Sequence, residues 1–264
     1  MRLTGTTGFP DAPVEYSALH CARNGEKCVM VTRIQEEWEL DVYIDDEVIF
    51  RIACTNNHLD EMVTGLLCTE GIVESTDEIE ELSMRETPLS AIVRLKEDGS
   101  LKRQRVPRRS EESVPAKVGS LHPVDPIVWD TDWVLKMIDE FSKDRTSHAS
   151  TGGTHSVFLS VPERILCMRE DIGRHNAFDK AVGWALANDV DLSKCMLFTS
   201  GRIPFDMIVK ATRAKIPILV TKAVATDKAI MAARNLGITL ISRALPDGFD
   251  VLSDPLNCSG ALIA

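Results

Sequence analysis

Residues 170–180 read Glu-Asp-Ile-Gly-Arg-His-Asn-Ala-Phe-Asp-Lys, with polar and charged side chains on both sides of one glycine. The apolar run at residues 164–168 leads into it, and an apolar-periodic run from Ala177 to Leu186 leads out of it. That context predicts a strand that ends, and a helix that begins, within the stretch. Backbone N–H groups without partners and the positive end of the helix dipole gather at such a turn, which favours anionic ligands. Since a helix start needs only one capping side chain, the seven polar or charged side chains here indicate a function.

Strands and helices alternate through the C-terminal half of the chain. Strands are expected at residues 155–161, 165–168, 195–199, 217–221, 238–242 and 249–252, and helices at residues 174–188, 205–215 and 227–236. Repeated strand–helix units are typical of a mostly parallel sheet covered by helices. The expected fold class is therefore α/β for this half and α+β for the chain as a whole.

The N-terminal half has a strand-rich pattern. Residues 1–28 are rich in Gly, Pro, Thr and Ala without a clear period, and they predict an extended or mobile lead-in. The segments that follow predict a β-hairpin at residues 38–52, a helix capped by Asn56-Asn57 and ended by Gly71, and strands at residues 79–84, 89–95 and 101–106.

Prolines and glycines separate the two halves. Residues 107–128 contain four prolines and one glycine, which predict a long loop, and a helix capped by Asp130 or Thr131 follows it. The expected organisation is a lead-in at residues 1–28, a β-rich domain at residues 29–128 and an α/β domain at residues 129–264.

Composition narrows the class of protein. The 264 residues carry a formal net charge of −10, which argues against general nucleic-acid binding. The seven cysteines are scattered and form no Cys-x-x-Cys pair, so they indicate reduced thiols of a cytosolic protein, and no metal site is expected. No apolar run reaches the ~20 residues that span a bilayer, and the expected location is the cytoplasm.

Polar turns follow three of the expected strands, at residues 170–180, 199–202 and 221–228, and a double glycine precedes a fourth strand. In a parallel sheet the carboxyl ends of the strands meet at one edge, where ligands bind. The cationic side chains of these turns suit phosphate groups. The candidate binding residues are Gly152, Gly153, His155, Asp171, Arg174, His175, Asp179, Lys180, Ser200, Gly201, Arg202 and Lys210.

Plainer interpretations remain open for several of these residues. A double glycine also occurs in a simple turn. His175 suits general acid–base catalysis and equally suits a hydrogen-bonding anchor. Asp171 and Asp179 are either ligands or partners that hold arginine and lysine side chains in place. The sequence has no motif of a serine hydrolase, a P-loop nucleotide hydrolase or a zinc protease.

The chain resembles the FdhD/NarQ family of accessory proteins that formate dehydrogenase needs for activity. The matching segments are Cys54-Thr55, residues 62–73, Thr151-Gly152-Gly153-Thr154-His155, residues 170–180 with Gly183, residues 200–202, residues 207–211 and residues 237–241. They run from residue 54 to residue 242 in the family's order. The Glu-Asp-x-Gly-Arg-His-Asn-Ala block is highly specific to that family.

The resemblance implies a small β-rich N-terminal domain and a C-terminal α/β domain similar to the cytidine deaminase fold, in a homodimer. Family members take persulfide sulfur from a cysteine desulfurase and pass it to molybdenum bis(molybdopterin guanine dinucleotide), which then enters formate dehydrogenase. A cofactor site that includes Ile241, Ser242 and Arg243 is therefore implied, with GDP or GTP as mimics. The zinc signature of the deaminases is absent, so deamination is not implied.

One departure from the family concerns the sulfur chemistry. Sulfurtransferases of the family carry Cys-x-x-Cys in the long loop that corresponds to residues 107–128, and this loop has no cysteine here. A persulfide relay needs an accessible thiolate. Two hypotheses follow. One is a sulfur carrier that uses another cysteine, with Cys21, Cys28 and Cys258 as candidates. The other is a non-catalytic cofactor- or nucleotide-binding chaperone without sulfurtransferase activity.

Overall fold

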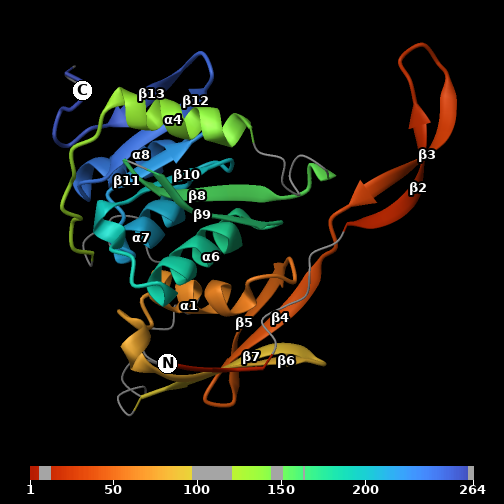
Figure 1. Ribbon diagram of the computed structural model, residues 1–264, viewed down its shortest axis with the longest axis horizontal. Coiled ribbons are helices and arrows are strands. Elements are labelled where there is room, and N and C mark those ends of the chain that lie inside the picture. Colours follow the sequence, from red (N-terminus) through yellow and green to blue (C-terminus); the bar gives the residue numbers. More distant parts are fainter. Residues whose placement is uncertain (6–12, 97–120, 144–150, 163, 261–264) are drawn as a thin grey trace.

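The computed structural model describes residues 1–5, 13–96, 121–143, 151–162 and 164–260. Within them the chain forms two lobes, each with its own sheet, and a hairpin that stands away from both lobes (Figure 1). The strand expected at residues 101–106 and most of the loop expected at residues 107–128 lie outside the described residues.

The first lobe is a five-stranded sheet with one helix, α1 (Leu59–Thr69), packed on it. In sheet order the strands are β1 (Arg2–Thr4), β6 (Ile79–Glu86), β7 (Leu89–Leu95), β4 (Trp38–Ile44) and β5 (Glu47–Cys54), and a short 3-10 helix, η1 (Thr76–Glu78), precedes β6. Alternate residues of β4 are buried in one cluster with α1, as the period-2 pattern of that segment predicts. The hairpin expected at residues 38–52 and the two strands after it are confirmed.

The second lobe is a six-stranded sheet with helices on both faces (Figure 1). In sheet order the strands are β13 (Gly248–Ser253), β12 (Thr239–Leu245), β11 (Ile218–Thr221), β10 (Met196–Thr199), β8 (His155–Val161) and β9 (Arg164–Asp171). The helices are α4 (Thr131–Ser142), α6 (Arg174–Ala187), the 3-10 helix η3 (Leu192–Lys194), α7 (Phe205–Arg213) and α8 (Asp227–Asn235). The pairings β10–β11 and β11–β12 are parallel, and those with β8, β9 and β13 are antiparallel. The expected α/β class is confirmed, whereas the sheet, expected to be mostly parallel, is mixed, with two parallel and three antiparallel pairings.

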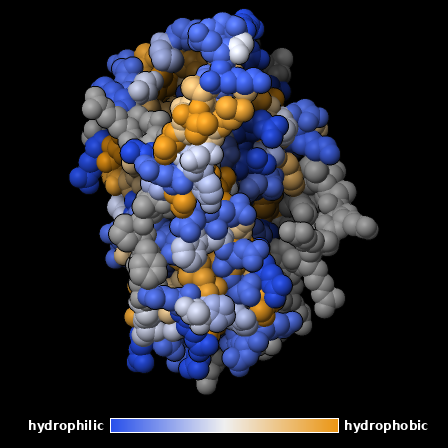
Figure 2. All heavy atoms as spheres, turned by 90° about the vertical axis from the view of Figure 1, so that its right-hand side faces the viewer, coloured by the Kyte–Doolittle hydropathy of each residue, from blue (hydrophilic) through white to orange (hydrophobic). Residues whose placement is uncertain are grey.

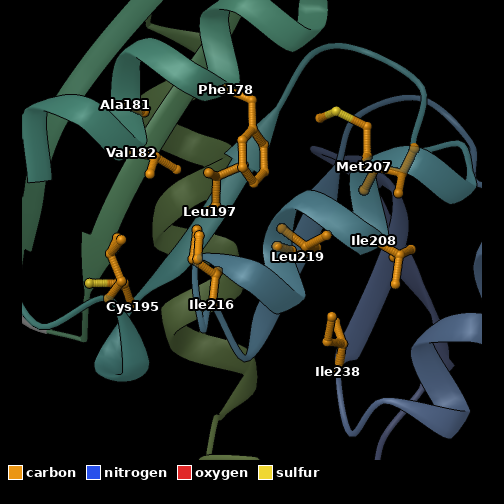
Figure 3. Packing of buried hydrophobic residues seen from close by; sticks show 14 of the residues in the cluster. Phe178, Ala181, Val182, Cys195, Leu197, Met207, Ile208, Ile216, Leu219 and Ile238 are labelled. Carbon is orange, nitrogen blue, oxygen red and sulfur yellow. The ribbon is translucent and has the colours of Figure 1, made fainter. Parts of the chain in front are cut away.

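Strands β10 and β11, in the middle of this sheet, are buried on both faces, which explains their continuous apolar sequences. Met196 and Phe198 of β10 belong to the core under α4, whereas Leu197 between them belongs to the core under α6, α7 and α8. Figure 3 shows Phe178 of α6 beside Leu197, with the side chains of α7 close to those of β11. Among the described residues, no helix is long and apolar enough to cross a membrane.

The two lobes meet where α1 packs against α6, and glycines make the contact close. A β-carbon added to Gly65 would overlap the carbonyl oxygen of Asp179 and lie 2.8 Å from the backbone nitrogen of Gly183. A β-carbon added to Gly183 would overlap the carbonyl oxygen of Glu61. Beside this crossing, Nη2 of Arg169 on β9 donates to Oε1 of Glu61 at 2.8 Å. Backbone packing and an ion pair therefore join the lobes.

The hairpin consists of β2 (Val14–Cys21) and β3 (Lys27–Ile34), which pair with each other over eight register positions. It stands away from both lobes in Figure 1, and most of its side chains are exposed. Figure 2 shows the side of the molecule on which the hairpin lies, and hydrophobic side chains are at the surface in the upper part of this view. Residues 1–28, expected as an extended or mobile lead-in, thus contribute β1 and β2, and the expected boundary at residue 28 falls inside β3.

The N-cap of α4 is a residue that the sequence predicts, whereas the N-cap of α1 is not. The Asp130 carboxylate accepts a hydrogen bond from the backbone nitrogen of Trp133 at 2.7 Å, which confirms the expected cap of α4. The expectation that Asn56-Asn57 caps α1 was wrong, because the N-cap is His58, in the left-handed region with φ 50° and without a side-chain cap. Oδ1 of Asn57 instead accepts a hydrogen bond from the buried ammonium group of Lys180 at 2.7 Å. Gly71, at φ +74°, follows α1 as expected.

Candidate functional site

The polar turns of the second lobe lie at one edge of its sheet. The first residue of β8, His155, is paired with the last residue of β9, Asp171. Thr199 ends β10 and is paired with Thr221, which ends β11. Antiparallel pairing of β8 with both of its neighbours places the start of β8 beside the ends of β9 and β10. The turns at residues 170–180, 199–202 and 221–228 and the start of β8 therefore share one edge, which we call the turn edge.

The turn after β10 is held by hydrogen bonds to both neighbouring strands. Backbone nitrogen of Ser156 donates to Oγ of Ser200 at 3.0 Å, and backbone nitrogen of Ser200 donates to the carbonyl of Ser156 at 3.0 Å. Oγ1 of Thr221 donates to the carbonyl oxygen of Gly201 at 2.6 Å. A β-carbon added to Gly201 would lie 3.0 Å from Cβ of Arg174 and 3.3 Å from Nδ1 of His155. Glycine at position 201 thus lets Arg174 and His155 approach the same turn.

Arg174 is the first residue of α6 and carries an unsatisfied donor. Its Nε is buried and has no hydrogen-bond partner among the described residues. The N-cap, Gly173, offers no side-chain cap, and its own nitrogen donates to Oδ1 of Asp171 at 2.9 Å. The first backbone N–H groups of a helix have no partner within it, and the helix dipole adds positive character. A buried guanidinium donor beside these groups is costly unless an acceptor satisfies it, which points to an anionic ligand.

His175 pairs with an acid that the sequence interpretation missed. Its Nε2 lies 2.9 Å from Oδ2 of Asp206, in the first turn of α7. Burial favours a higher pKa for Asp206, but the hydrogen bond and charge of His175 outweigh it and lower the pKa of that carboxyl. The contact supports the interpretation of His175 as a hydrogen-bonding anchor. Asp206 follows Pro204-Phe205 at a helix start, and this acidic first turn was the available signal.

Asp171 and Lys180 belong to a buried network that joins the lobes. Both side chains are fully buried, and Nζ of Lys180 lies 2.7 Å from Oδ2 of Asp171. The same ammonium group donates to Oγ1 of Thr55 at 2.6 Å, and Oδ2 of Asp171 accepts from Oγ1 of Thr55 at 3.0 Å. Nδ2 of Asn176 donates to Oδ1 of Asp171 at 2.8 Å. The interpretation of Asp171 as a partner that fixes a lysine is the one these contacts support.

Asp179 and Lys210 form a second buried network against α1. Nζ of Lys210 donates to Oδ2 of Asp179 at 2.8 Å and to Oγ1 of Thr69 at 2.9 Å, and it lies 3.1 Å from Oε1 of Glu70. Burial alone would lower the pKa of Lys210, but the carboxylates of Asp179 and Glu70 outweigh it and raise that pKa. Four of the expected cofactor residues thus have their charges satisfied within the protein, at positions that face the first lobe.

The remaining candidates lie along or near the turn edge. Gly152 and Gly153 are exposed, with Gly152 at φ +65°. Arg202 is exposed in the turn after β10. Ile241 and Ser242 are buried in β12, and Arg243, at φ 47°, donates its backbone N–H to the carbonyl of Ala223 at 2.8 Å. The residues that the structure places around one turn are therefore His155, Arg174, Ser200 and Gly201, with Arg202 beside them.

All seven cysteines fall within the described residues. Cys21 and Cys28 are exposed, Cys258 is half-buried, and the other four are buried. Burial raises the pKa of Cys68 to about 11 and those of Cys167 and Cys195 to about 12. Buried thiols of this kind are poor nucleophiles, because the thiolate is the reactive form. Within the described part of the chain, no cluster of three or more His, Cys, Asp or Glu side chains could hold a metal ion.

The chain is similar to proteins of one family in both sequence and fold. The model of the FdhD/NarQ family matches residues 35–258. Sulfur carrier protein FdhD of Bacillus subtilis (strain 168) is 28% identical over 241 residues, which cover 88% of this chain and 92% of that protein. The protein of the same name from Geobacillus kaustophilus is 28% identical over 239 residues, covering 87% and 91%. A crystal structure described as a formate dehydrogenase accessory protein from Desulfotalea psychrophila has the same fold, with a TM-score of 0.76 at 20% identity over 93% of this chain and 98% of that chain.

Proposed function

The chain belongs to the FdhD/NarQ family, and we propose from this premise that it carries sulfur to a molybdenum cofactor during maturation of formate dehydrogenase. In this proposal it binds molybdenum bis(molybdopterin guanine dinucleotide) as cargo and accepts sulfur from a cysteine desulfurase. It then passes the sulfur to the bound cofactor. Family membership supports the accessory role, and the geometry of the turn edge supports the cofactor site.

The buried, unsatisfied Nε of Arg174 is the observation that carries the cofactor proposal. Guanine-dinucleotide cofactors present phosphate groups, and a guanidinium group beside a helix N-terminus is a suitable partner for phosphate. Gly201 keeps the space beside Arg174 free of a side chain. Arg174, Arg202, Ser200 and the first N–H groups of α6 would hold the phosphates.

The other residues of the turn edge would orient this cargo. His175, fixed by Asp206, stands at the same helix start as Arg174. His155 lies 3.4 Å from Oγ of Ser200 through its Nδ1, which positions both groups at the start of β8. The buried Asp171–Lys180 network connects this edge to the loop between β5 and α1. In this proposal the Asp171–Lys180 network fixes the turn, and Arg174, Ser200 and Arg202 bind the phosphates.

Substitution of Arg174 by alanine is expected to weaken the binding of GDP, used as a probe, by about 1–3 kcal/mol, because a charge-assisted hydrogen bond is lost. Isothermal titration calorimetry would measure the dissociation constants. Arg164→Ala is the matched control, since Arg164 is an exposed arginine at the opposite end of β9. Unchanged GDP affinity in Arg174→Ala, with normal thermal stability, would remove the site from the proposal.

The proposed function also requires partner proteins. A cysteine desulfurase would be the sulfur donor, formate dehydrogenase the client, and the working form a homodimer in the cytoplasm. These parts rest on the family alone. Size-exclusion chromatography with light scattering would measure the oligomeric state directly.

A second candidate function is that of a cofactor-holding chaperone without sulfur chemistry. The absence of cysteine from residues 107–128 favours it, together with the burial of four of the seven cysteines. Such a chaperone would bind GDP as the sulfur carrier does. The two candidates differ in whether any cysteine accepts a persulfide.

A further inference from the structure

We propose that Cys28, on the β2–β3 hairpin, is the thiol that carries the sulfur, as a persulfide formed with the help of His20. This inference rests on the proposed sulfur-carrier function and assigns its reacting atom. The hairpin precedes residue 35, where the match to the family model begins. The assignment therefore comes from this chain's own geometry.

Exposure leaves few cysteines that a donor could reach. Cys54, Cys68, Cys167 and Cys195 are buried in the cores of the two lobes. Cys258 is half-buried and packs against the core under α4. Cys21 and Cys28 are the exposed pair, and both lie near the tip of the hairpin that stands away from the lobes (Figure 1).

The register of the hairpin places these two thiols on opposite faces. Cys28 is directly opposite His20, whereas Cys21 is directly opposite Lys27. Because successive side chains of a strand point to opposite faces, and directly opposed residues share a face, the two cysteines point away from each other. A disulfide needs β-carbons that face each other at about 3.5–4.5 Å, which this register does not provide.

This separation protects a persulfide. A thiol within reach would attack the inner sulfur of a Cys28 persulfide, form a disulfide and release hydrogen sulfide, so that the cargo would be lost. With Cys21 on the other face, the sulfur has to leave to an external acceptor.

The two faces also differ in chemistry. The face of Cys28 contains no Asp, Glu, Lys or Arg, and His20 is its one imidazole; the other members are Val14, Tyr16, Ala18, Met30, Thr32 and Ile34. The face of Cys21 carries the Glu15–Arg33 ion pair and Lys27. Directly opposed residues have β-carbons about 4.5–5.5 Å apart, which brings an imidazole within reach of the thiol. A neutral imidazole can take the thiol proton, and a protonated ammonium group such as that of Lys27 cannot.

The loading step balances without an oxidant. His20 accepts the proton of Cys28, and the thiolate attacks the terminal sulfur of a donor persulfide, R–S–SH. The S–S bond of the donor breaks and a new S–S bond forms on Cys28. The donor leaves as the thiolate R–S⁻, which takes the proton from His20. The products are a Cys28 persulfide and the donor thiol.

The test uses the full chain and cysteine persulfide as the donor probe. After brief incubation, persulfides are trapped by alkylation and located by peptide mass spectrometry. Most of the label is expected on Cys28. Cys28→Ser is expected to lose it, and Cys21→Ser, the matched control on the opposite face, is expected to keep it. His20→Asn is expected to slow loading at neutral pH about tenfold or more and to alter the pH dependence of the loading rate, because the thiol loses its proton acceptor.

Each contrary result has a distinct meaning. Label mainly on Cys21 or Cys258, with Cys28→Ser unaffected, overturns the assignment and leaves the sulfur-carrier function standing. An unchanged rate and pH profile in His20→Asn overturns the role of His20. Label on no cysteine overturns the sulfur-carrier function together with the assignment, whereas GDP binding would survive it.

Discussion

Lys210→Met is expected to lower the free energy of unfolding by about 3–5 kcal/mol, because it leaves the carboxylate of Asp179 buried without its counter-ion. Asp179 is 2% exposed and Lys210 6% exposed, so water cannot replace the lost partner. Oγ1 of Thr69 donates to Oδ1 of Asp179 at 2.7 Å, and this single hydrogen bond does not compensate a charge. Urea denaturation, followed by circular dichroism, would measure the loss.

Lys194→Met is the matched control for that experiment. Lys194 also pairs with an aspartate, Asp191, at 2.9 Å, but both side chains are largely exposed. Exposed ion pairs contribute little to stability, so the control is expected to unfold like the wild type. Equal, small losses in the two lysine variants would show that the Asp179–Lys210 pair between α6 and α7 is not a buried network.

Gly183→Ala is expected to destabilise the chain by about 3 kcal/mol, because the added β-carbon would overlap the backbone of α1. Alanine favours an isolated helix over glycine by about 1 kcal/mol, so the expected loss has the opposite sign to helix propensity. The added β-carbon would overlap backbone atoms of Glu61, and because alanine has no side-chain rotamers, no rotamer change can relieve this overlap. Thermal unfolding would show a lower melting temperature.

Ala187→Gly tests how much intrinsic helix propensity contributes to stability in the same helix. Ala187 is the last residue of α6 and is exposed, so this change is expected to cost at most about 1 kcal/mol. If Gly183→Ala were as stable as the wild type or more stable, the close crossing of α1 and α6 would be contradicted.

Much of the second lobe could be predicted from the sequence, because its signals are local. The apolar runs of β10 and β11 are continuous, as required for strands buried on both faces. Asp130 precedes a helical stripe and caps α4. The carboxyl ends of adjacent strands then gather the polar turns at one edge, as the topology rule requires.

The roles of individual polar residues could not be predicted, since they depend on contacts between distant segments. Asp179 and Lys180 lie more than one turn beyond Arg174 on α6, where they face the first lobe. Their partners Thr69 and Thr55 are 110 and 125 residues away in the chain. The β2–β3 hairpin was not predicted, for another reason. Both of its faces are exposed and carry apolar residues, so no period-2 pattern marks them.

The turn edge and the β2–β3 hairpin lie apart in the molecule (Figure 1). The turn edge would hold the cofactor through Arg174, and the hairpin would bring sulfur on Cys28. Binding and sulfur loading should therefore separate in variants. Arg174→Ala is expected to load sulfur normally, and Cys28→Ser is expected to bind GDP normally.

The claim that Cys28 carries the sulfur is tested by measuring sulfur transfer to formate dehydrogenase. The chain is loaded with radiolabelled sulfur and incubated with the molybdenum cofactor and inactive formate dehydrogenase. The wild type is expected to deliver label and activate the enzyme, while Cys28→Ser is expected to deliver at least about tenfold less at equal cofactor binding. Full activation by a chain that combines Cys21→Ser, Cys28→Ser and Cys258→Ser would contradict the claim and leave a cofactor-holding chaperone.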